Sequence, residues 1–247
     1  MIHLKLQGVI FLVIINFSVS AQNIFYIKPF AGMGFSNIIS RSFSTGISTF
    51  PSDNHLLKSY DGGVAIGHRM GNVDISTGIQ ILSTGTKHTG IVFWNGAGPS
   101  DSGYYSNRFR HLMIPVNIGY HIHIGKKFSV MPEIGIAASY NFNGTTYSKT
   151  QIRNERHNFS PANSNFHMFS LFGSGQLNIQ YVLNQMLALT LTPSFYYMLT
   201  NFDNPPSGAP FDPKEHPYAA NVNIGLVINL NDRKSSAPTP VSNSQTQ

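Results

Sequence analysis

Large apolar residues alternate with small or polar residues along eight segments of the chain. The clearest segment spans 111–123, and its apolar positions are Leu112, Ile114, Val116, Ile118, Tyr120 and Ile122. Because successive side chains of a β-strand point to opposite faces, a period of two predicts strands with one apolar face. The eight predicted strands cover residues 24–36, 57–70, 73–84, 111–123, 128–142, 166–182, 186–200 and 217–230.

The segments between these strands alternate in length. Short turns are expected at Gly71-Asn72, around Gly125 and around Asn184. The other connections are long and rich in Gly, Ser, Asn and Pro, and they span 37–56, 85–108, 143–165 and 201–216. Short turns on one rim and long loops on the other predict an all-β fold, an eight-stranded antiparallel up-and-down transmembrane β-barrel with short periplasmic turns and long extracellular loops.

The two ends of the chain differ from the strand region. Residues 1–21 combine Lys5, an apolar run and a small-residue stretch ending at Ala21, a pattern typical of a cleaved signal peptide. Residues 22–230 form the expected barrel domain, and 231–247 lack any apolar period, so we expect a disordered periplasmic tail. These features predict export to a bacterial outer membrane.

Composition narrows the possible classes of protein further. Charged residues make up 11% of the chain, against about 25% in soluble domains. The balance is basic, but Lys and Arg are scattered, so a nucleic-acid partner is not expected. The chain has no cysteine, which rules out a disulfide framework and a thiolate nucleophile.

The polar face of the strands carries few charges. Gly, Ser, Thr, Asn and Ala dominate it, which suits the narrow interior of an eight-stranded barrel. The expected lumen network consists of Lys28, Asp61, Arg69, Asp74, Asn117 and Glu133. The turns should set Arg69 opposite Asp74 and Glu133 opposite Asn117, which predicts a paired polar plug rather than an open channel.

Two constellations could carry chemistry. His111 and Ser139, expected opposite each other, are the candidates for a serine hydrolase, but an orienting carboxylate is missing from the same height of the inward face. His121 and His123 share the inward face and could hold a metal, but a third ligand is missing. The sequence therefore predicts neither catalysis nor a cofactor. In loop 143–165, Lys149, Arg153, Arg156 and His157 surround Glu155 and could grip lipopolysaccharide phosphates, or form a solvated mixed-charge loop.

Two adjacent strands carry a resemblance to a known family. Residues 111–121 read HLMIPVNIGYH and residues 128–137 read FSVMPEIGIA. A strand with Ile-Pro, a short turn and a strand with Pro-x-x-Gly resemble the small porin-like outer-membrane β-barrel family, which includes the OmpA/OmpX-like barrels. The resemblance implies membrane location and fold, and it implies no substrate. The family commonly ends on an aromatic residue, whereas the last strand here ends at Leu230.

The leading functional hypothesis is a non-enzymatic monomeric barrel that contacts outer-membrane lipid and lipopolysaccharide. It would act through its extracellular loops, which could bind an extracellular ligand, or as a structural membrane component. One alternative is a lipid-modifying hydrolase using His111 and Ser139. Another is an accessory barrel of a secretion or envelope-assembly system, with residues 232–247 recruiting a partner.

Overall fold

The computed structural model describes residues 23–41, 53–94, 99–149, 154–160, 166–202 and 214–230. The predicted signal peptide and periplasmic tail lie outside these residues. The strands are β1 (Asn23–Arg41), β2 (Asp53–His55), β3 (Leu57–Met70), β4 (Val73–Trp94), β5 (Pro99–Tyr120), β6 (Ile122–Ile124), β7 (Phe128–Lys149), β8 (Asn154–Phe159), β9 (Phe169–Val182), β10 (Leu187–Met198) and β11 (Lys214–Asn229). Within the described ranges, no helix is long and apolar enough to cross a membrane.

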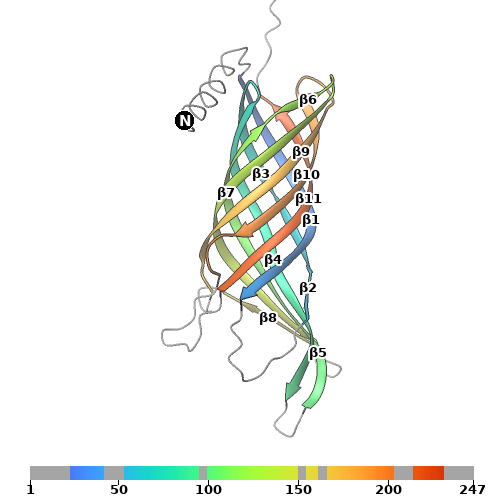
Figure 1. Cartoon of the computed structure of the whole chain (residues 1–247), viewed down its shortest axis with the longest axis vertical. Helices are drawn as coiled ribbons and strands as arrows, with labels where there is room; N and C mark the ends of the chain where they lie inside the picture. Colours follow the sequence, from blue (N-terminus) through green and yellow to red (C-terminus); the bar gives the residue numbers. More distant parts are fainter. Residues whose placement is uncertain are drawn as a thin grey trace, which may run out of the picture.

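Eight long strands close into a ring. Each of β1, β3, β4, β5, β7, β9, β10 and β11 pairs antiparallel with its neighbour in chain order, and β11 pairs with β1. The three remaining strands are short, and they extend the rims of this ring (Figure 1). The predicted fold class is confirmed: the chain is an eight-stranded antiparallel up-and-down barrel.

The outer wall of the barrel is apolar. From Leu112 to Tyr120 of β5 the exposed side chains are those of the predicted apolar face, and Ile122 of β6 continues this face. On β7 the exposed side chains include Ile134 and Ile136. The alternate residues point inward, so the predicted assignment of faces is confirmed. Exposed aromatic residues ring both ends of this wall: Phe25, Tyr120 and Phe128 toward the short turns, and Tyr60, Tyr140, Phe142, Phe169 and Phe195 toward the other rim.

An apolar belt between aromatic rings is the surface that a bilayer covers. The outer wall therefore has the surface of a β-barrel that spans a lipid bilayer. Tyr26 also lies near the short-turn end of β1, but it is buried inside the barrel. Its ring points inward because Phe25, its neighbour, occupies the outward position of β1.

Two of the predicted long loops are largely strand. Strands β4 and β5 continue through most of 85–108 as a hairpin that projects beyond the barrel, toward the bottom of Figure 1. In 143–165, β7 continues to Lys149 and pairs with β8. The prediction of loops there was wrong. Both faces of these strand extensions are polar or mixed, as in the run from Lys87 to Thr89, so the apolar alternation that predicts a strand is absent although the strand continues.

The turns fix the register of the strands. Gly71, with φ of 60°, lies in a two-residue turn that sets Arg69 opposite Asp74, as expected. The turn after β6 has three residues, Gly125 to Lys127, and Gly125 has φ of 81°. A turn centred on Gly125 would pair Asn117 with Glu133, but the three-residue turn shifts the register by two, so Glu133 faces Gly119 and Asn117 faces Gly135.

Candidate functional site

The inner part of the lumen, toward the short turns, contains a buried ion pair. Arg69 Nε lies 3.3 Å from Asp74 Oδ2, and the Tyr26 hydroxyl donates a 2.6 Å hydrogen bond to Asp74 Oδ1. The Arg69 guanidinium lies 5.8 Å from the centre of the Tyr26 ring and donates to Gln180 Oε1 at 3.5 Å. Both carboxylate oxygens of Asp74 are thus occupied, which a buried charge requires.

A second charged group lies in the middle of the lumen. Lys28 Nζ and Glu133 Oε1 are 4.0 Å apart, and Asn178 donates to the same glutamate oxygen at 3.1 Å. A further set of hydrogen bonds links β3, β4 and β10: Gln80 Nε2 donates to Asp61 Oδ2 at 3.3 Å and to the Tyr196 hydroxyl at 2.8 Å.

The remaining space at this level is small. Ser174 donates to Asn117 Oδ1 at 3.3 Å. A cavity of about 20 Å³ lies between Lys28, Asn117 and Tyr196, which is room for about one water molecule. The six residues of the lumen network therefore occupy the interior from several strands at once.

The outer part of the lumen is filled by an aromatic cluster that the sequence analysis missed. Its members come from β5, β8 and β9 and from the segments that follow β8 and β10: Phe109, Phe159, Phe166, Phe172 and Phe202. Phe109 packs edge-to-face on Phe202, with ring centres 4.5 Å apart, and on Phe166 at 4.9 Å. Phe109 belongs to the inward parity of His111 and Met113, and this parity could have revealed it.

The candidate hydrolase pair is not assembled. His111 faces Asn141 and Ser139 faces Met113, so the prediction that they lie opposite each other was wrong. The cause is the three-residue turn described above. His111 Nε2 hydrogen-bonds with the Thr84 hydroxyl at 2.8 Å, and its ring packs edge-on against Phe172.

The candidate metal pair lies at the periplasmic rim. The rings of His121 and His123 are 4.7 Å apart, but only His121 is buried. His121 Nε2 lies within hydrogen-bond distance of Gln180 Oε1 and the Ser129 hydroxyl. No group of three or more potential metal ligands occurs in the part of the chain that the structure describes.

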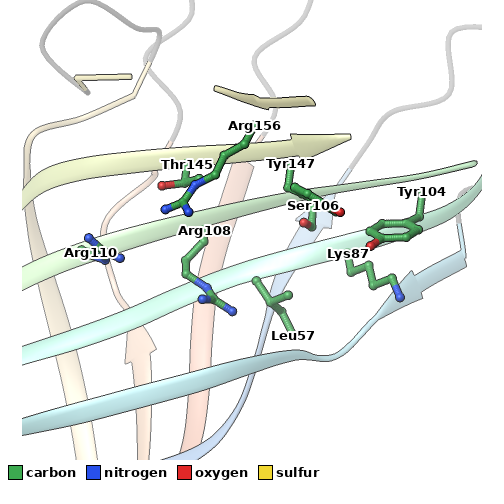
Figure 2. Close-up of a pocket in the computed structure, with 9 residues that line it drawn as sticks. All are labelled: Leu57, Lys87, Tyr104, Ser106, Arg108, Arg110, Thr145, Tyr147 and Arg156. Carbon is green, nitrogen blue, oxygen red and sulfur yellow. The ribbon is translucent and has the colours of Figure 1, made fainter. Parts of the chain in front are cut away.

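A basic groove opens on the other rim, where β4, β5, β7 and β8 extend past the apolar belt. This rim groove has a volume of about 410 Å³. Its lining side chains are shown in Figure 2: Leu57, Lys87, Tyr104, Ser106, Arg108, Arg110, Thr145, Tyr147 and Arg156. Four of them are cationic and none is a carboxylate.

Strand parity explains why these side chains share one face. Arg108 and Arg110 continue the outward parity of Leu112 along β5. On β7 a bulge leaves Phe142 without a partner, and beyond it Thr145 pairs with Arg108. The bulge turns the end of β7 so that its odd-numbered residues face outward.

Aromatic rings hold two of the cations. Lys87 Nζ lies 4.4 Å from the centre of the Tyr104 ring, and Arg108 lies 5.6 Å from that of Tyr60. The Tyr104 and Tyr147 rings are 5.6 Å apart. Hydrogen bonding between these two phenols raises the pKa of Tyr104 above its ordinary value.

Comparison with known proteins gives matches by structure alone. No protein-family model and no curated protein matches the chain. Neisserial surface protein A is 13% identical with a TM-score of 0.42, and the match covers 83% of this chain and 96% of that chain. OprG from Pseudomonas aeruginosa is 13% identical with a TM-score of 0.42, and the match covers 86% of this chain and 97% of OprG. The outer membrane protease OmpT from Escherichia coli is 9% identical with a TM-score of 0.43, and the match covers 85% of this chain and 97% of OmpT. Similarity at this level supports no inference about function.

Proposed function

We propose that this protein is a non-enzymatic monomeric barrel with a closed lumen, which acts at its extracellular rim while its wall contacts outer-membrane lipid and lipopolysaccharide. The observation that carries the proposal is the filling of the lumen by two different layers. The lumen network lies toward the periplasmic turns, and the aromatic cluster lies toward the outer rim.

The aromatic layer supports closure most directly. Phe109, Phe172 and Phe202 each have 0% exposed surface, so water does not contact their side chains. An eight-stranded barrel leaves an interior that side chains can fill, and here large rings occupy it. A solute path would need these rings to move apart.

The projecting strands support action at the rim. They add a paired sheet beyond the apolar belt, and they carry the basic rim groove. His111 and Ser139 are not in contact, so the hydrolase alternative that depends on them gains no support. Two other buried hydroxyl groups do contact a histidine, Thr84 on His111 and Ser129 on His121, but Nδ1 of each histidine has no hydrogen-bond partner among the described residues that would orient the ring as a triad requires. The secretion-accessory alternative depends on residues 232–247, which lie outside the described residues.

Conductance across planar bilayers tests the closed lumen. Purified protein should give no steady current, and the double variant Phe109→Ala, Phe202→Ala should give small current steps because the outer layer is opened. The matched control is Phe195→Ala, which removes an exposed ring from the outer wall and should leave the membrane silent. Steady current through the unaltered protein would refute the proposal.

A further inference from the structure

We propose that the rim groove is a binding site for the phosphate groups of an outer-leaflet glycolipid, such as the lipid A part of lipopolysaccharide. This inference deepens the proposed function, because it assigns a ligand class to the extracellular rim. It depends on the charge of the groove, on its height above the apolar belt and on its size.

The charge of the groove is unbalanced. Lys87, Arg108, Arg110 and Arg156 line it without any carboxylate residue. Both ion pairs found among the described residues lie in the lumen, so neither neutralises these cations. Arg108 Nε is buried and has no hydrogen-bond partner within the described ranges, although its Nη2 donates to the Lys58 carbonyl at 3.4 Å. A buried guanidinium donor without a partner favours an anionic ligand.

The height of the groove matches a lipid headgroup. Arg110 is the next outward residue of β5 after Leu112, about 7 Å further along the strand. Tyr60, which underlies Arg108, belongs to the outer aromatic ring. Aromatic rings of this kind mark the interface between hydrocarbon and headgroups.

A second hollow joins the rim groove to the apolar belt. It has a volume of about 420 Å³, and it shares Arg108 and Arg110 with the rim groove while it reaches the exposed Ile81 below them. Asp61 borders it, but the Asp61 carboxylate accepts hydrogen bonds from Gln80 and Tyr196. A lipid could therefore place its phosphates on the guanidinium groups and its acyl chains along Ile81.

Cations and hydroxyl groups line the groove together. In Figure 2, Arg156 reaches past Thr145 toward Arg108, and Lys87 lies further along under Tyr104. Hydroxyl groups from Ser106 and Tyr147 line the groove with the cations and can donate to phosphate oxygens, whereas the Thr145 hydroxyl already donates to Asn158 Oδ1 at 3.0 Å. A volume of about 410 Å³ lies within the usual range of ligand pockets.

Equilibrium binding of bisphosphorylated lipid A to the full chain in detergent micelles tests this site. The unaltered protein should bind it, and the same lipid with its phosphates removed should bind about tenfold more weakly or worse. The double variant Arg108→Gln, Arg110→Gln should show a similar loss. The matched control is Lys126→Gln, Lys127→Gln, which removes two exposed cations from the periplasmic turn and should bind like the unaltered protein.

Folding of each variant is checked by its mobility on an unboiled detergent gel. If the double variant does not fold, the single variant Arg156→Gln gives the readout, because this side chain is exposed. Equal binding by the rim and control variants would overturn the proposal, as would equal binding of the lipid without phosphates. Tighter binding of inorganic pyrophosphate or of a soluble sulfated glycan would overturn the assignment to a glycolipid. None of these outcomes changes the conductance on which the closed lumen depends.

Discussion

The buried pair of Arg69 and Asp74 allows the stability of the barrel interior to be tested directly. We expect Asp74→Ala to destabilise the barrel by about 4 kcal/mol. Removing one partner of a buried pair costs about 3–5 kcal/mol, because the other charge stays buried without compensation. The Arg69 and Asp74 side chains are only 10% and 3% exposed, so water cannot replace the lost carboxylate. The Tyr26 hydroxyl loses its 2.6 Å acceptor as well.

Urea unfolding in lipid vesicles measures this change, with the folded fraction read from the mobility of unboiled samples on gels. Lys126→Gln is the control, because it removes a charge from an exposed position in the turn after β6 and should change the stability by less than about 0.5 kcal/mol. The triple variant Tyr26→Phe, Arg69→Met, Asp74→Leu should recover most of the lost stability, because it leaves no unpaired polar group. A loss below about 1 kcal/mol for Asp74→Ala would refute the reasoning that this pair is shielded from water.

Three further predictions follow from the geometry. Gly67→Ala should lower the free energy of unfolding by about 1–3 kcal/mol in the same urea titration, because the new Cβ would lie 2.1 Å from the Tyr26 ring. Gly175→Ala is the control and should leave the stability unchanged, because its Cβ would meet nothing within 4 Å. Gly71→Ala should cost about 1 kcal/mol, because φ of 60° is unfavourable for a residue with a Cβ. Burial lowers the pKa of His88, which lies in the projecting hairpin, so its unfolded form binds more protons below about pH 6.5. The amide protection factors of the hairpin, which correct for the pH dependence of intrinsic exchange, should therefore fall as the pH drops below that value, and His88→Gln should remove the effect.

The sequence predicted most of the barrel wall because lipid contact and the strand period act on every residue there. Leu112 and Ile134 could be assigned to the outer face from alternation alone. The pairing of Arg69 with Asp74 followed from the two-residue turn at Gly71, because a turn of known length determines which residues face each other. The three-residue turn after β6 could not be distinguished from a shorter one, and the register of His111 and Ser139 was therefore wrong.

The interior and the rim were harder to predict. The lumen was expected to be polar throughout, and Phe172 and Phe202 could not be placed without knowing where their strands end. The rim groove depends on the extension of β5 and β7 beyond the apolar belt, where the alternation that reveals strands is absent. Arg156 was recognised as a possible phosphate contact, but Arg108 and Arg110 lay in a predicted loop and at its edge.

The unpaired Phe142 determines which insertions and deletions this protein can tolerate at its outer rim. A single extra residue sets the phase of the last part of β7, so that Thr145 and Tyr147 look outward while Gly144 packs inside under Phe159. Deleting that residue would exchange the two sets, burying hydroxyl groups among the rings and exposing the backbone around Gly144. The ligand-facing and interior surfaces of the outer rim are thus tied to one position, and an insertion or deletion there would alter both together.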